Sequence, residues 1–514
     1  MIEGQATVKQ TEGLARRHPV KAFSKLGTTG LWVSQAGFGG YRITHEARPH
    51  GEALGFALRN GINLIDTSTN YADGGSEILV GLALQALTAS GKFSRDQIVV
   101  VSKAGYLQGA THRLSQERKK EGRPFPELVA FGEGLEHCIH PEFLADQLGR
   151  SLRRLDLSTL DVFLLHNPEY YLEWAQKQGV ALEEARKTYY RRIRAAFEHL
   201  ESEADSGRIG CYGISSNTFP AAAEDAGFTS LSKVWEIAES VSPGHRFRVV
   251  QLPFNLLESG AALAANQPEG QSVLEWAQSR GIGILTNRPL NAFTGTQLVR
   301  LAEIDQTRRQ DTNEIIQKIR ALGRSEKRLW RKLLPDLGVP HGLQVRIKQQ
   351  LSIAEVLTHY WRNFGSYERW RQVRSGNFQP RVQGVIDFLA PYAQTDAETA
   401  SWIEDHTACV AAAYRAVGSI YAEAEALRLA AIRRAVDAAD SDWAQDGTLS
   451  QKALRAVRST SGVSAVLVGM RREAYVQDVL RELARNIPQR DRKPSWRNLK
   501  RSLEATVLSS GRRH

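Results

Sequence analysis

The sequence predicts an α/β protein whose core is a closed barrel of eight parallel strands, each joined to the next by a helix. Short apolar runs alternate with helical patterns along the chain, and each apolar run ends in polar residues. Strands spaced in this way pair in parallel through right-handed crossovers, and this number of them favours a closed barrel over an open sheet. A long stretch of helical composition, 296–461, lies between the last two strands and predicts a large helical insertion.

The first predicted elements are a hairpin and a glycine-rich strand. Short apolar runs flank a glycine-rich turn at 27–30, within the segment 21–33, which is the usual signal of a hairpin. The next strand ends in glycines at 37–40. These glycines do not form a GxGxxG pattern that leads into a helix, so the fingerprint of an open dinucleotide-binding sheet is absent.

After this strand, a helix, a glycine and an apolar strand recur as a unit. Gly61, Gly207 and Gly281 each follow a helical pattern and precede an apolar run, as expected of glycines that end helices. The expected helices are 50–60, 76–88, 140–155, 189–206, 231–240 and 272–280. The expected strands are 62–65, 98–101, 160–165, 209–214, 248–252, 282–285 and 465–468. Together with the glycine-rich strand they make a (β/α)8, or TIM, barrel.

Several connections between predicted strands are longer than the single helix that this repeating unit requires. Segments 105–139 and 169–187 are long, and we expect them to carry structure of their own over one face of the barrel. No linker rich in Pro, Gly or Ser flanks the insertion, which favours an insertion in the barrel over a separate tethered domain. We divide the chain into an N-terminal extension (1–20), barrel strands one to seven (21–295), the insertion with its crossover helix (296–461), strand eight with a final helix (462–484) and a basic tail (485–514).

Composition and charge narrow the classes of function. The 514 residues are 42% hydrophobic and 24% charged, which is typical of a globular protein. The formal net charge is +11, and the segment 485–514 supplies much of it, with nine Lys or Arg residues against two acids. Such a tail is more typical of a solvated or poorly ordered extension than of a nucleic-acid site. We therefore do not expect nucleic acid or a membrane surface as the partner.

The cysteines suggest neither a disulfide framework nor a metal site. Cys138, Cys211 and Cys409 are far apart and form no CxxC pair. His137 and His140 flank the first of them, but without the paired spacing of a structural zinc site, so we expect no metal. The polar N-terminus lacks a signal-peptide core and no run of eighteen apolar residues occurs, so the cytoplasm is the expected location.

Side chains that could take part in catalysis follow three consecutive strands. Asp66 comes directly after an apolar run and Tyr71 follows five residues later; Lys103 and His166 end the next two strands. Because the loops at the carboxyl ends of barrel strands converge on one face, we expect these side chains to meet. Alone, Asp66 is also compatible with a helix N-cap, and Lys103 or His166 with an ordinary hydrogen bond at a strand end. Their joint appearance favours a site.

The motifs at these strand ends resemble those of the aldo-keto reductases, barrel enzymes that reduce aldehydes and ketones with NADPH. The resemblance extends over 23–293 and 463–483, and it covers neither the insertion nor the basic tail. The matching motifs are 61–68 with Tyr71, 101–103, 155–156 with 160–166, 213–217, 251–255 and 469–471.

The resemblance implies a catalytic tetrad of Asp66, Tyr71, Lys103 and His166. Reduction of a carbonyl by hydride leaves an alkoxide that needs a proton, and the resemblance assigns Tyr71 as the donor. A phenol has an unperturbed pKa of about 10, so we expect Lys103 to lower the pKa of Tyr71 and Asp66 to keep Lys103 charged and oriented. His166 would hydrogen-bond the carbonyl oxygen and hold it for attack.

The resemblance also implies a site for NADPH and its oxidised form NADP+, in preference to NADH. Ser216, Asn217 and Gln251 would surround the nicotinamide carboxamide, whose amide needs matched donors and acceptors. Arg471 or Arg472 would suit a 2′-phosphate, although solvated surface charge equally explains these arginines. The further implied cofactor positions are Gly39, Asn287, Arg288, Pro289, Leu290, Gly469 and Asp478.

One motif departs from the family pattern. Where the family has a Tyr-x-Pro-Leu motif, whose tyrosine stacks under the nicotinamide ring, this chain has Asn287, Arg288, Pro289 and Leu290. The stacking contact is therefore lost or supplied from elsewhere, which bears on cofactor affinity and not on the tetrad.

These features predict an oxidoreductase of aldo-keto reductase type that transfers hydride between NADPH and an aldehyde, ketone or sugar carbonyl. The alternative is a nucleotide-binding barrel that acts as a regulatory or scaffolding subunit through its insertion, which is also a candidate for self-association. Within the insertion, the aromatic and basic residues Trp361, Phe364, Tyr367, Trp370 and Arg371 have helical spacing. A packed helix face is the favoured explanation, and contact with a partner or substrate is the alternative.

Overall fold

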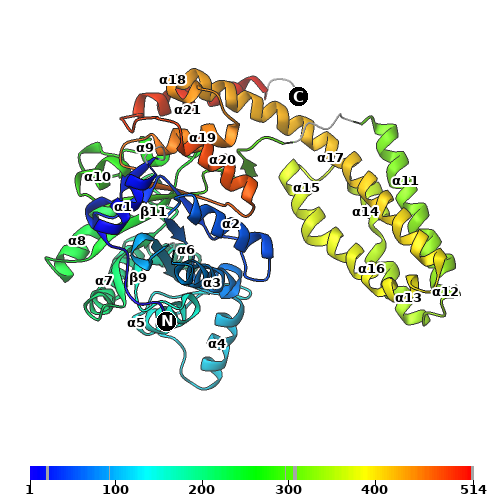
Figure 1. Ribbon diagram of the computed structural model, residues 1–514, viewed down its shortest axis with the longest axis horizontal. Helices are drawn as coiled ribbons and strands as arrows, with labels where there is room; N and C mark the ends of the chain where they lie inside the picture. The colour runs from blue at the N-terminus through cyan, green and yellow to red at the C-terminus, as the bar shows by residue number, and fades with distance from the viewer. Residues whose placement is uncertain (19–21, 92, 296, 305–309, 511–514) are drawn as a thin grey trace. The chain divides into compact units, whose positions relative to one another are not determined.

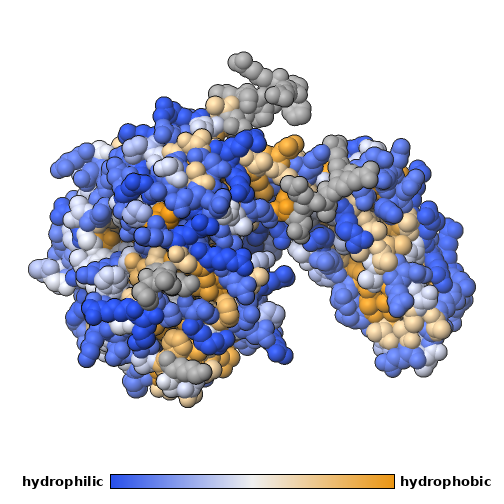
Figure 2. Space-filling model, turned by 45° about the horizontal axis from the view of Figure 1, so that its top comes forward, coloured by the Kyte–Doolittle hydropathy of each residue, from blue (hydrophilic) through white to orange (hydrophobic). Residues whose placement is uncertain are grey.

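The computed structural model describes residues 1–18, 22–91, 93–295, 297–304 and 310–510 of the chain. These residues form two compact units, Met1–Gln297 with Ala435–His514, and Leu298–Arg434. The first unit contains the barrel and the second is helical (Figure 1). The face seen in Figure 2 is mostly hydrophilic. Among the described helices, none has the length and apolar character needed to cross a membrane.

A closed parallel barrel organises the first unit and confirms the predicted fold class. Within the described residues its strands stand side by side in chain order, and the last pairs with the first. They are β3 (Ala36–Gly39), β4 (Leu64–Asp66), β5 (Val99–Ala104), β9 (Leu160–His166), β10 (Ile209–Ser215), β11 (Phe247–Pro253), β12 (Gly283–Asn287) and β15 (Ala465–Val468). All eight segments for which the sequence predicts strands therefore belong to the barrel.

Helices connect these strands, as the recurring unit of helix, glycine and strand predicts. Gly61, Gly207 and Gly281 have φ angles of 90°, 74° and 67°, a left-handed conformation that costs glycine little and that ends a helix. The helices around the barrel are α2 (Arg48–Arg59), α3 (Gly75–Ala89), α5 (Pro141–Leu155), α7 (Leu182–Asp205), α8 (Leu231–Val241), α10 (Val273–Ser279), α19 (Leu449–Arg458) and α20 (Glu473–Leu483).

The predicted hairpin closes the amino end of the barrel. It consists of β1 (Phe23–Lys25) and β2 (Trp32–Ser34), and its apolar side chains join the core that fills the barrel. A Cβ on Gly27 would lie 2.4 Å from the carbonyl oxygen of Gly281, so the turn needs a glycine to approach the start of β12. The N-terminal extension forms α1 (Val8–Arg17), which packs on β2. The hairpin and α1 therefore cover the amino end of the barrel.

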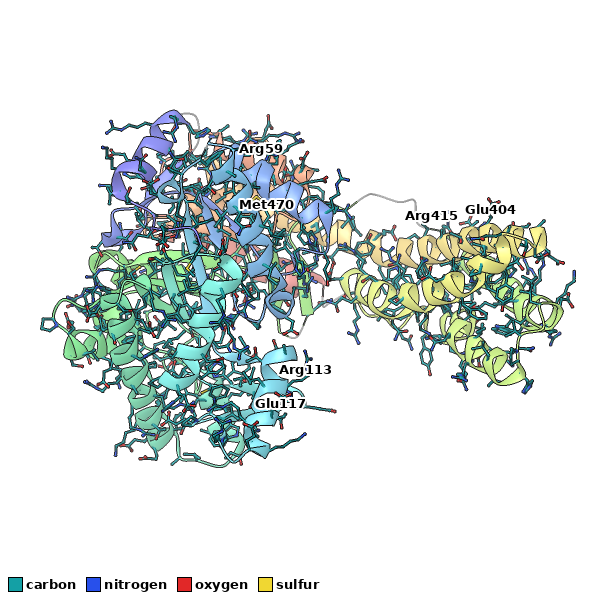
Figure 3. All side chains as sticks on the ribbon, turned by 60° about the horizontal axis from the view of Figure 1, so that its bottom comes forward. Arg59, Arg113, Glu117, Glu404, Arg415 and Met470 are labelled. Atoms are coloured by element: carbon teal, nitrogen blue, oxygen red, sulfur yellow. The ribbon has the colours of Figure 1, made fainter. Side chains whose placement is uncertain are left out.

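The two long segments that follow β5 and β9 carry their own structure, as expected. The first contains β6 (Tyr106–Leu107), α4 (Gly109–Lys120), β7 (Val129–Gly132) and β8 (Leu135–His137), whose strands form an antiparallel sheet of order β6-β8-β7. α4 presents the charged residues Arg113 and Glu117 to solvent (Figure 3). The second contains α6 (Tyr170–Lys177). Both segments lie at the carboxyl ends of the strands.

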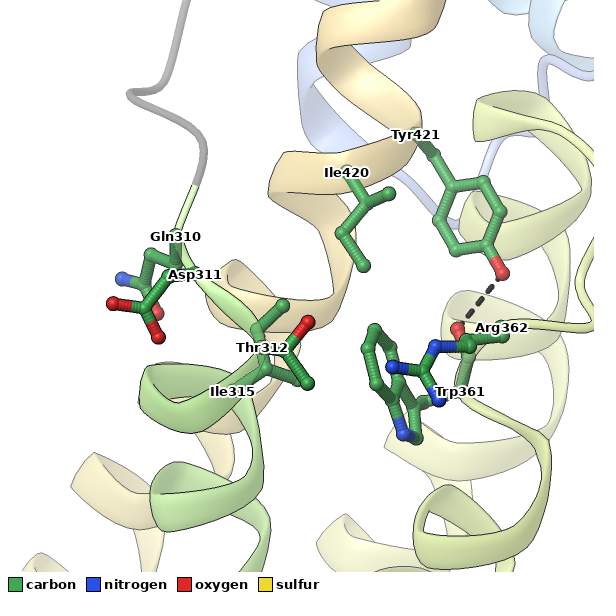
Figure 4. Close-up of a pocket in the computed structure, with 8 residues that line it drawn as sticks. All are labelled: Gln310, Asp311, Thr312, Ile315, Trp361, Arg362, Ile420 and Tyr421. Atoms are coloured by element: carbon green, nitrogen blue, oxygen red, sulfur yellow. Dashed lines mark hydrogen bonds between the residues drawn. The ribbon is translucent and has the colours of Figure 1, made fainter.

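The second unit is a helical body with a hydrophobic core of its own. Its main helices are α11 (Thr312–Arg328), α13 (His341–Leu351), α14 (Ile353–Tyr360), α15 (Tyr367–Val373), α16 (Gln379–Ala393) and most of α17 (Ala397–Ala439). Trp361 and Trp370 are buried in this core, which supports the packed-face explanation of that aromatic pattern. A pocket of about 480 Å3 opens within the unit, where Trp361, Arg362 and Tyr421 line it (Figure 4).

The C-terminal segment is packed against the barrel, so the expectation of a solvated or poorly ordered tail is wrong. It forms α21 (Lys493–Ser510), and Trp496 on this helix is fully buried. The Trp496 ring centroid lies 4.5 Å from that of Phe254 and 4.9 Å from that of Trp443. The expectation rested on the net charge of the segment, which says nothing of the apolar Trp496 and Leu499. These two side chains lie on one side of the helix and are both buried.

The basic residues Arg492 and Lys493, at the start of α21, are neutralised within the protein. Arg492 is 1% exposed, and its guanidinium nitrogens lie 2.8 Å from Asp440 Oδ2 and 2.7 Å from Asp442 Oδ2. Lys493 pairs with Glu275 of α10 at 2.8 Å. A buried guanidinium needs such partners, because an unpaired buried charge costs several kcal/mol. Part of the positive charge of this segment is therefore structural.

Truncation of the buried Trp496 side chain tests whether this packing stabilises the barrel unit. We expect Trp496→Ala to lower the free energy of unfolding by about 3–5 kcal/mol, because it removes a large buried ring and leaves a cavity. The matched control is Arg497→Ala, since this neighbouring side chain is exposed and its removal should change stability by less than about 0.5 kcal/mol. Urea denaturation of both variants measures the difference. Equal stability of the two would show that α21 is not docked.

Candidate active site

Four strands of the barrel carry a polar side chain two residues after an apolar side chain that fills the barrel. Leu64, Val101, Leu164 and Val249 belong to the barrel core. Asp66, Lys103, His166 and Gln251 follow them in the same order. Because side chains alternate along a strand, residues two apart lie on one face. The four polar side chains therefore form a layer directly above the apolar filling, at the carboxyl end of the barrel.

A buried ion pair between neighbouring strands lies at the centre of this layer. Lys103 Nζ donates to Asp66 Oδ1 at 2.6 Å and to the carbonyl oxygen of Thr67 at 2.7 Å. The two side chains are 0% and 6% exposed. A buried charge is costly unless it is paired and hydrogen-bonded, and β4 and β5 are paired in the sheet. The register of the two strands therefore brings each charge to its partner.

Gln251 approaches the same carboxylate from the other side of the barrel. Its Nε2 donates to Asp66 Oδ1 at 2.8 Å, and its Oε1 accepts from Ser215 Oγ at 3.0 Å and from Asn287 Nδ2 at 3.4 Å. Both ends of the Gln251 amide are thus engaged inside the protein. In this geometry Gln251 orients Asp66. To bind a cofactor amide, as the sequence suggests, Gln251 would have to give up some of these hydrogen bonds.

Tyr71 lies above the ion pair. It begins the turn η2 (Tyr71–Gly74), and Lys103 Nζ lies 5.0 Å from the centroid of its ring. The ring packs edge-on against Tyr41 and His166, with centroids 5.3 and 5.9 Å away. Within the described part of the chain the Tyr71 hydroxyl makes no hydrogen bond, which leaves it available to a substrate oxygen.

His166 completes the group at the end of β9. It is 7% exposed, its Nδ1 lies 3.1 Å from Ser68 Oγ, and its ring packs edge-on against Tyr106 with centroids 4.7 Å apart. Among the described residues Nε2 has no hydrogen-bond partner. The structure thus brings the four predicted tetrad residues together, and the described residues leave His166 Nε2 and the Tyr71 hydroxyl without a hydrogen-bond partner.

Burial dominates the protonation states of this site. The pKa of His166 is held well below its usual value by burial and by the charge of Lys103, so the imidazole is neutral at pH 7. Burial also lowers the pKa of Lys103, and Asp66 opposes this shift. The pKa of Tyr71 is raised well above its usual value, first by burial and then by Asp66 and Tyr41.

The raised pKa of Tyr71 differs from the expectation that Lys103 would lower it. Burial of the phenol is the first cause, and the charge of Asp66 and the neighbouring Tyr41 add to it, so that together they outweigh the attraction of the Lys103 ammonium for a phenolate. A phenol of raised pKa keeps its proton at neutral pH. It can still protonate an alkoxide, which is a much stronger base than a phenolate. The arrangement therefore suits a proton donor better than a phenolate nucleophile.

The predicted cofactor residues near β10, β12 and β15 differ in how freely they can meet a ligand. Ser216 is buried and its Oγ lies 3.1 Å from Thr218 Oγ1, whereas Asn217 is exposed. Asn287 Oδ1 is buried and lacks a partner among the described residues, and such an orphaned acceptor fits a ligand that donates a hydrogen bond.

The two glycines among the predicted cofactor residues differ in the space beside them. A Cβ at Gly469 would meet open space, whereas one at Gly39 would lie 3.2 Å from the carbonyl oxygen of Val468.

Other predicted cofactor residues are engaged in protein contacts. Arg288, with φ of 56°, pairs with Glu258 at 3.0 Å and lies over the ring of Phe293. Asp478 accepts from Ser450 Oγ at 2.7 Å and from Gln451 Nε2 at 2.8 Å, at the start of α19. These bonds give Asp478 a structural role. Pro289 and Leu290 form the turn before β13 (Asn291–Thr294), and Arg471 lies in the loop before α20.

Three residues beside the tetrad escaped prediction. Tyr106 contacts the His166 ring, and Glu169 Oε1 accepts from the backbone N–H of Asn217 and from Asn167 Nδ2, both at 2.8 Å. Both follow a tetrad residue by three positions, so extension of each strand-end motif would have found them. His137 donates from Nε2 to the carbonyl oxygen of His166 at 2.7 Å. Its place depends on the antiparallel pairing of β6 and β8, which no local pattern reveals.

Comparisons with known proteins point to one enzyme family. The model of the Aldo/keto reductase family matches residues 37–346. An NADH-specific methylglyoxal reductase of Escherichia coli (strain K12) is 30% identical over 198 residues, which are 36% of this chain and 55% of that protein. The chain thus matches about half the length of this curated relative.

Solved structures of aldo-keto reductases are also similar. An aldo-keto reductase, AKR11C1, from Bacillus halodurans in its holo form has 19% identity and a TM-score of 0.34, covering 60% of this chain and 82% of that chain. An aldo/keto reductase from Klebsiella pneumoniae in complex with NADP and acetate has 19% identity and a TM-score of 0.32, covering 52% and 69%.

The buried His137 gives the barrel unit a dependence of stability on pH. Burial lowers its pKa to about 4, whereas an unfolded histidine has a pKa of about 6.5. As pH falls from about 6.5 to 4 the unfolded state binds a proton that the native state excludes, so the free energy of unfolding falls, by about 3 kcal/mol from this group. In His137→Gln, urea denaturation at several pH values should give a flatter dependence. Parallel curves for the two proteins would contradict this pKa.

Proposed function

The chain belongs to the aldo/keto reductase family, and on that basis we propose that it is an oxidoreductase that reduces the carbonyl group of an aldehyde, ketone or sugar with NADPH. The observation that carries the proposal is the Lys103–Asp66 ion pair beneath Tyr71, with His166 beside the same phenol ring. The unengaged Tyr71 hydroxyl and His166 Nε2 are the two groups that a carbonyl oxygen needs, one for proton donation and one for orientation.

In the proposed reaction, His166 and Tyr71 hold the carbonyl oxygen between them. The proposed reaction uses the neutral tautomer of His166 that carries its hydrogen on Nε2. In this tautomer Nε2–H donates to the carbonyl oxygen and Nδ1 accepts from the Ser68 hydroxyl, which turns to it from Asn70 Oδ1, 2.7 Å away. The bound nicotinamide supplies the hydride to the carbonyl carbon. As negative charge develops on the oxygen, Tyr71 transfers its proton, and the nearby positive charge of Lys103 stabilises the phenolate that remains. Asp66 and Gln251 keep the Lys103 ammonium in place throughout.

The aromatic residues around Tyr71 bear on the substrate. Tyr41 is 60% exposed and its ring packs against that of Tyr71, while Tyr106 packs against His166 and Tyr170. A carbonyl that reaches Tyr71 would therefore pass between aromatic rings. These rings favour substrates whose carbonyl adjoins a planar or apolar group, and a sugar ring can also stack on them.

Residues at three strand ends would hold the cofactor. Ser216, Asn217 and the orphaned Oδ1 of Asn287 suit the nicotinamide amide, because that group both donates and accepts hydrogen bonds. Gly469 and Arg471 lie just before the N-terminus of α20, which favours a phosphate at that point. Two arginines in this loop favour NADPH over NADH, because a guanidinium pairs with a 2′-phosphate. The E. coli relative, described as NADH-specific, favours the opposite preference.

Removal of the Tyr71 hydroxyl tests the proposed activity. NADPH oxidation is followed against a panel of aldehydes, ketones and sugars, and Tyr71→Phe should lower kcat by about 100-fold or more, because the proton donor is lost. Tyr360→Phe is the matched control, since this phenol of the helical unit is 56% exposed and the variant should keep the wild-type rate. Full activity in Tyr71→Phe would refute the role of Tyr71. NADPH binding without turnover of any carbonyl would favour a regulatory or scaffolding barrel.

Cofactor preference is tested by removal of the two arginines before α20. We expect Arg471→Ala and Arg472→Ala each to weaken NADPH binding about 10-fold and to leave NADH binding nearly unchanged, because only NADPH has the 2′-phosphate. Arg481→Ala, in the last turn of the same helix, controls for net charge. Fluorescence titration gives both dissociation constants. Equal effects on the two cofactors, or tighter binding of NADH by the wild type, would show that the preference is not for NADPH.

A further inference from the structure

His137 is buried beside the proposed active site although it is not one of the four tetrad residues. It ends β8 in the segment after β5, is 0% exposed, and donates from Nε2 to the main-chain carbonyl oxygen of His166 at 2.7 Å. Its ring stacks on Tyr170 with centroids 5.5 Å apart and meets the edge of Tyr106 at 5.5 Å. The inserted sheet therefore reaches the backbone of the residue that would orient the substrate.

The hydrogen bond fixes the form of the His137 ring. A carbonyl oxygen only accepts, so Nε2 carries the hydrogen. Burial keeps the ring neutral, which leaves Nδ1 unprotonated. Nδ1 is buried and has no partner in the described residues, and an unsatisfied buried acceptor destabilises the native state. A hydrocarbon ring would avoid that cost, so what the histidine contributes at this position is its Nε2–H donor.

The carbonyl oxygen of His166 needs this donor because it lies past the end of the sheet ladder on that side. β9 pairs with β5 only as far as Leu165, opposite Ala104. The residue after His166, Asn167, has φ of 52°, and its N–H turns to the carbonyl oxygen of Ser215 on β10. His137 therefore takes the place of a strand partner for the last residue of β9.

Gly105 gives a second, independent sign of this convergence. A Cβ on Gly105 would lie 2.3 Å from the carbonyl oxygen of His166 and 2.8 Å from Nε2 of His137. Gly105 also accepts a hydrogen bond from the backbone N–H of Cys138 at 2.9 Å. Only a residue without a side chain allows the ends of β5, β8 and β9 to meet at this point, so the approach of His137 to His166 is built into the backbone.

We propose that His137 is a positioning residue, which fixes the main chain of His166 so that the His166 ring keeps Nδ1 on Ser68 and presents Nε2 to the substrate carbonyl. This inference rests on the proposed function. It makes the segment 105–139 part of the reductase site. It also gives a role to His137, whose neighbourhood lacks the spacing of a metal site: His137 supports catalysis by positioning His166.

Two substitutions separate the donor from the ring. His137→Phe keeps an aromatic ring and removes the Nε2–H, and we expect kcat to fall about 10- to 100-fold with little change in KM, because the orienting group is misplaced. His137→Gln keeps an N–H donor that reaches similarly far and should recover most of the loss. Steady-state kinetics and thermal unfolding are measured for both. Equal kcat in His137→Phe and the wild type, or equal losses in both variants, would overturn the proposal.

A double-mutant cycle shows whether His137 acts through His166. In a His166→Ala background, His137→Phe should change kcat by less than about twofold, because the group that it positions is already absent. A merely structural role would cost the same factor in both backgrounds and would overturn the inference.

A direct structural reading separates this inference from the proposed function. If turnover is absent or does not depend on Tyr71, the proposed function fails, and the crystal structure of His137→Phe decides the inference alone. Movement of the His166 ring away from Ser68 supports it. Retention of the 3.1 Å contact between Nδ1 and Ser68 Oγ would contradict it.

Discussion

The buried ion pair of Lys103 and Asp66 is the interaction on which the rest of the site depends. Both charges stand directly above the apolar filling of the barrel, where an unpaired charge would be costly. The pairing of β4 with β5 and the reach of Gln251 from β11 satisfy them. The cost of burial thus forces three strands into one arrangement, and that arrangement places an ammonium group beneath the Tyr71 phenol.

A second layer of structure holds this centre in place. The barrel supplies Asp66, Lys103 and His166 from its own strands, whereas the segments inserted after β5 and β9 supply Tyr106, His137 and Glu169. Their contacts reach the ring and the main chain of His166 and the backbone of the residues after β10. Side chains on regular elements hold a site more firmly than side chains on free loops. This supports the view that the long segments are part of the site.

The barrel could be predicted from local patterns in the sequence, whereas the grouping of Asp66, Tyr71, Lys103 and His166 was predicted from their places at strand ends and from the resemblance to a family. An apolar run that ends in Asp66, Lys103 or His166 identifies a strand and its carboxyl end at once, and the barrel then brings such ends together. The partner of Gln251 could not be predicted, because Asp66 is 185 residues away and either end of an amide can find many partners. The raised pKa of Tyr71 is a sum over everything that buries the ring. The burial of Trp496 could not be predicted either, because the many basic residues next to it in the sequence indicated a solvated segment.

The proposed reaction passes hydride to a carbonyl carbon held above the Lys103–Asp66 pair. The most direct measurement uses NADPH deuterated at the transferable position of the nicotinamide C4, with mass spectrometry of the alcohol product. The deuterium should appear on the carbinol carbon, and Lys103→Met should lower the rate of this transfer by about 100-fold or more, because the ammonium beneath Tyr71 is lost. Cofactor oxidation without deuterium on the carbinol carbon, or transfer at the wild-type rate in Lys103→Met, would contradict it.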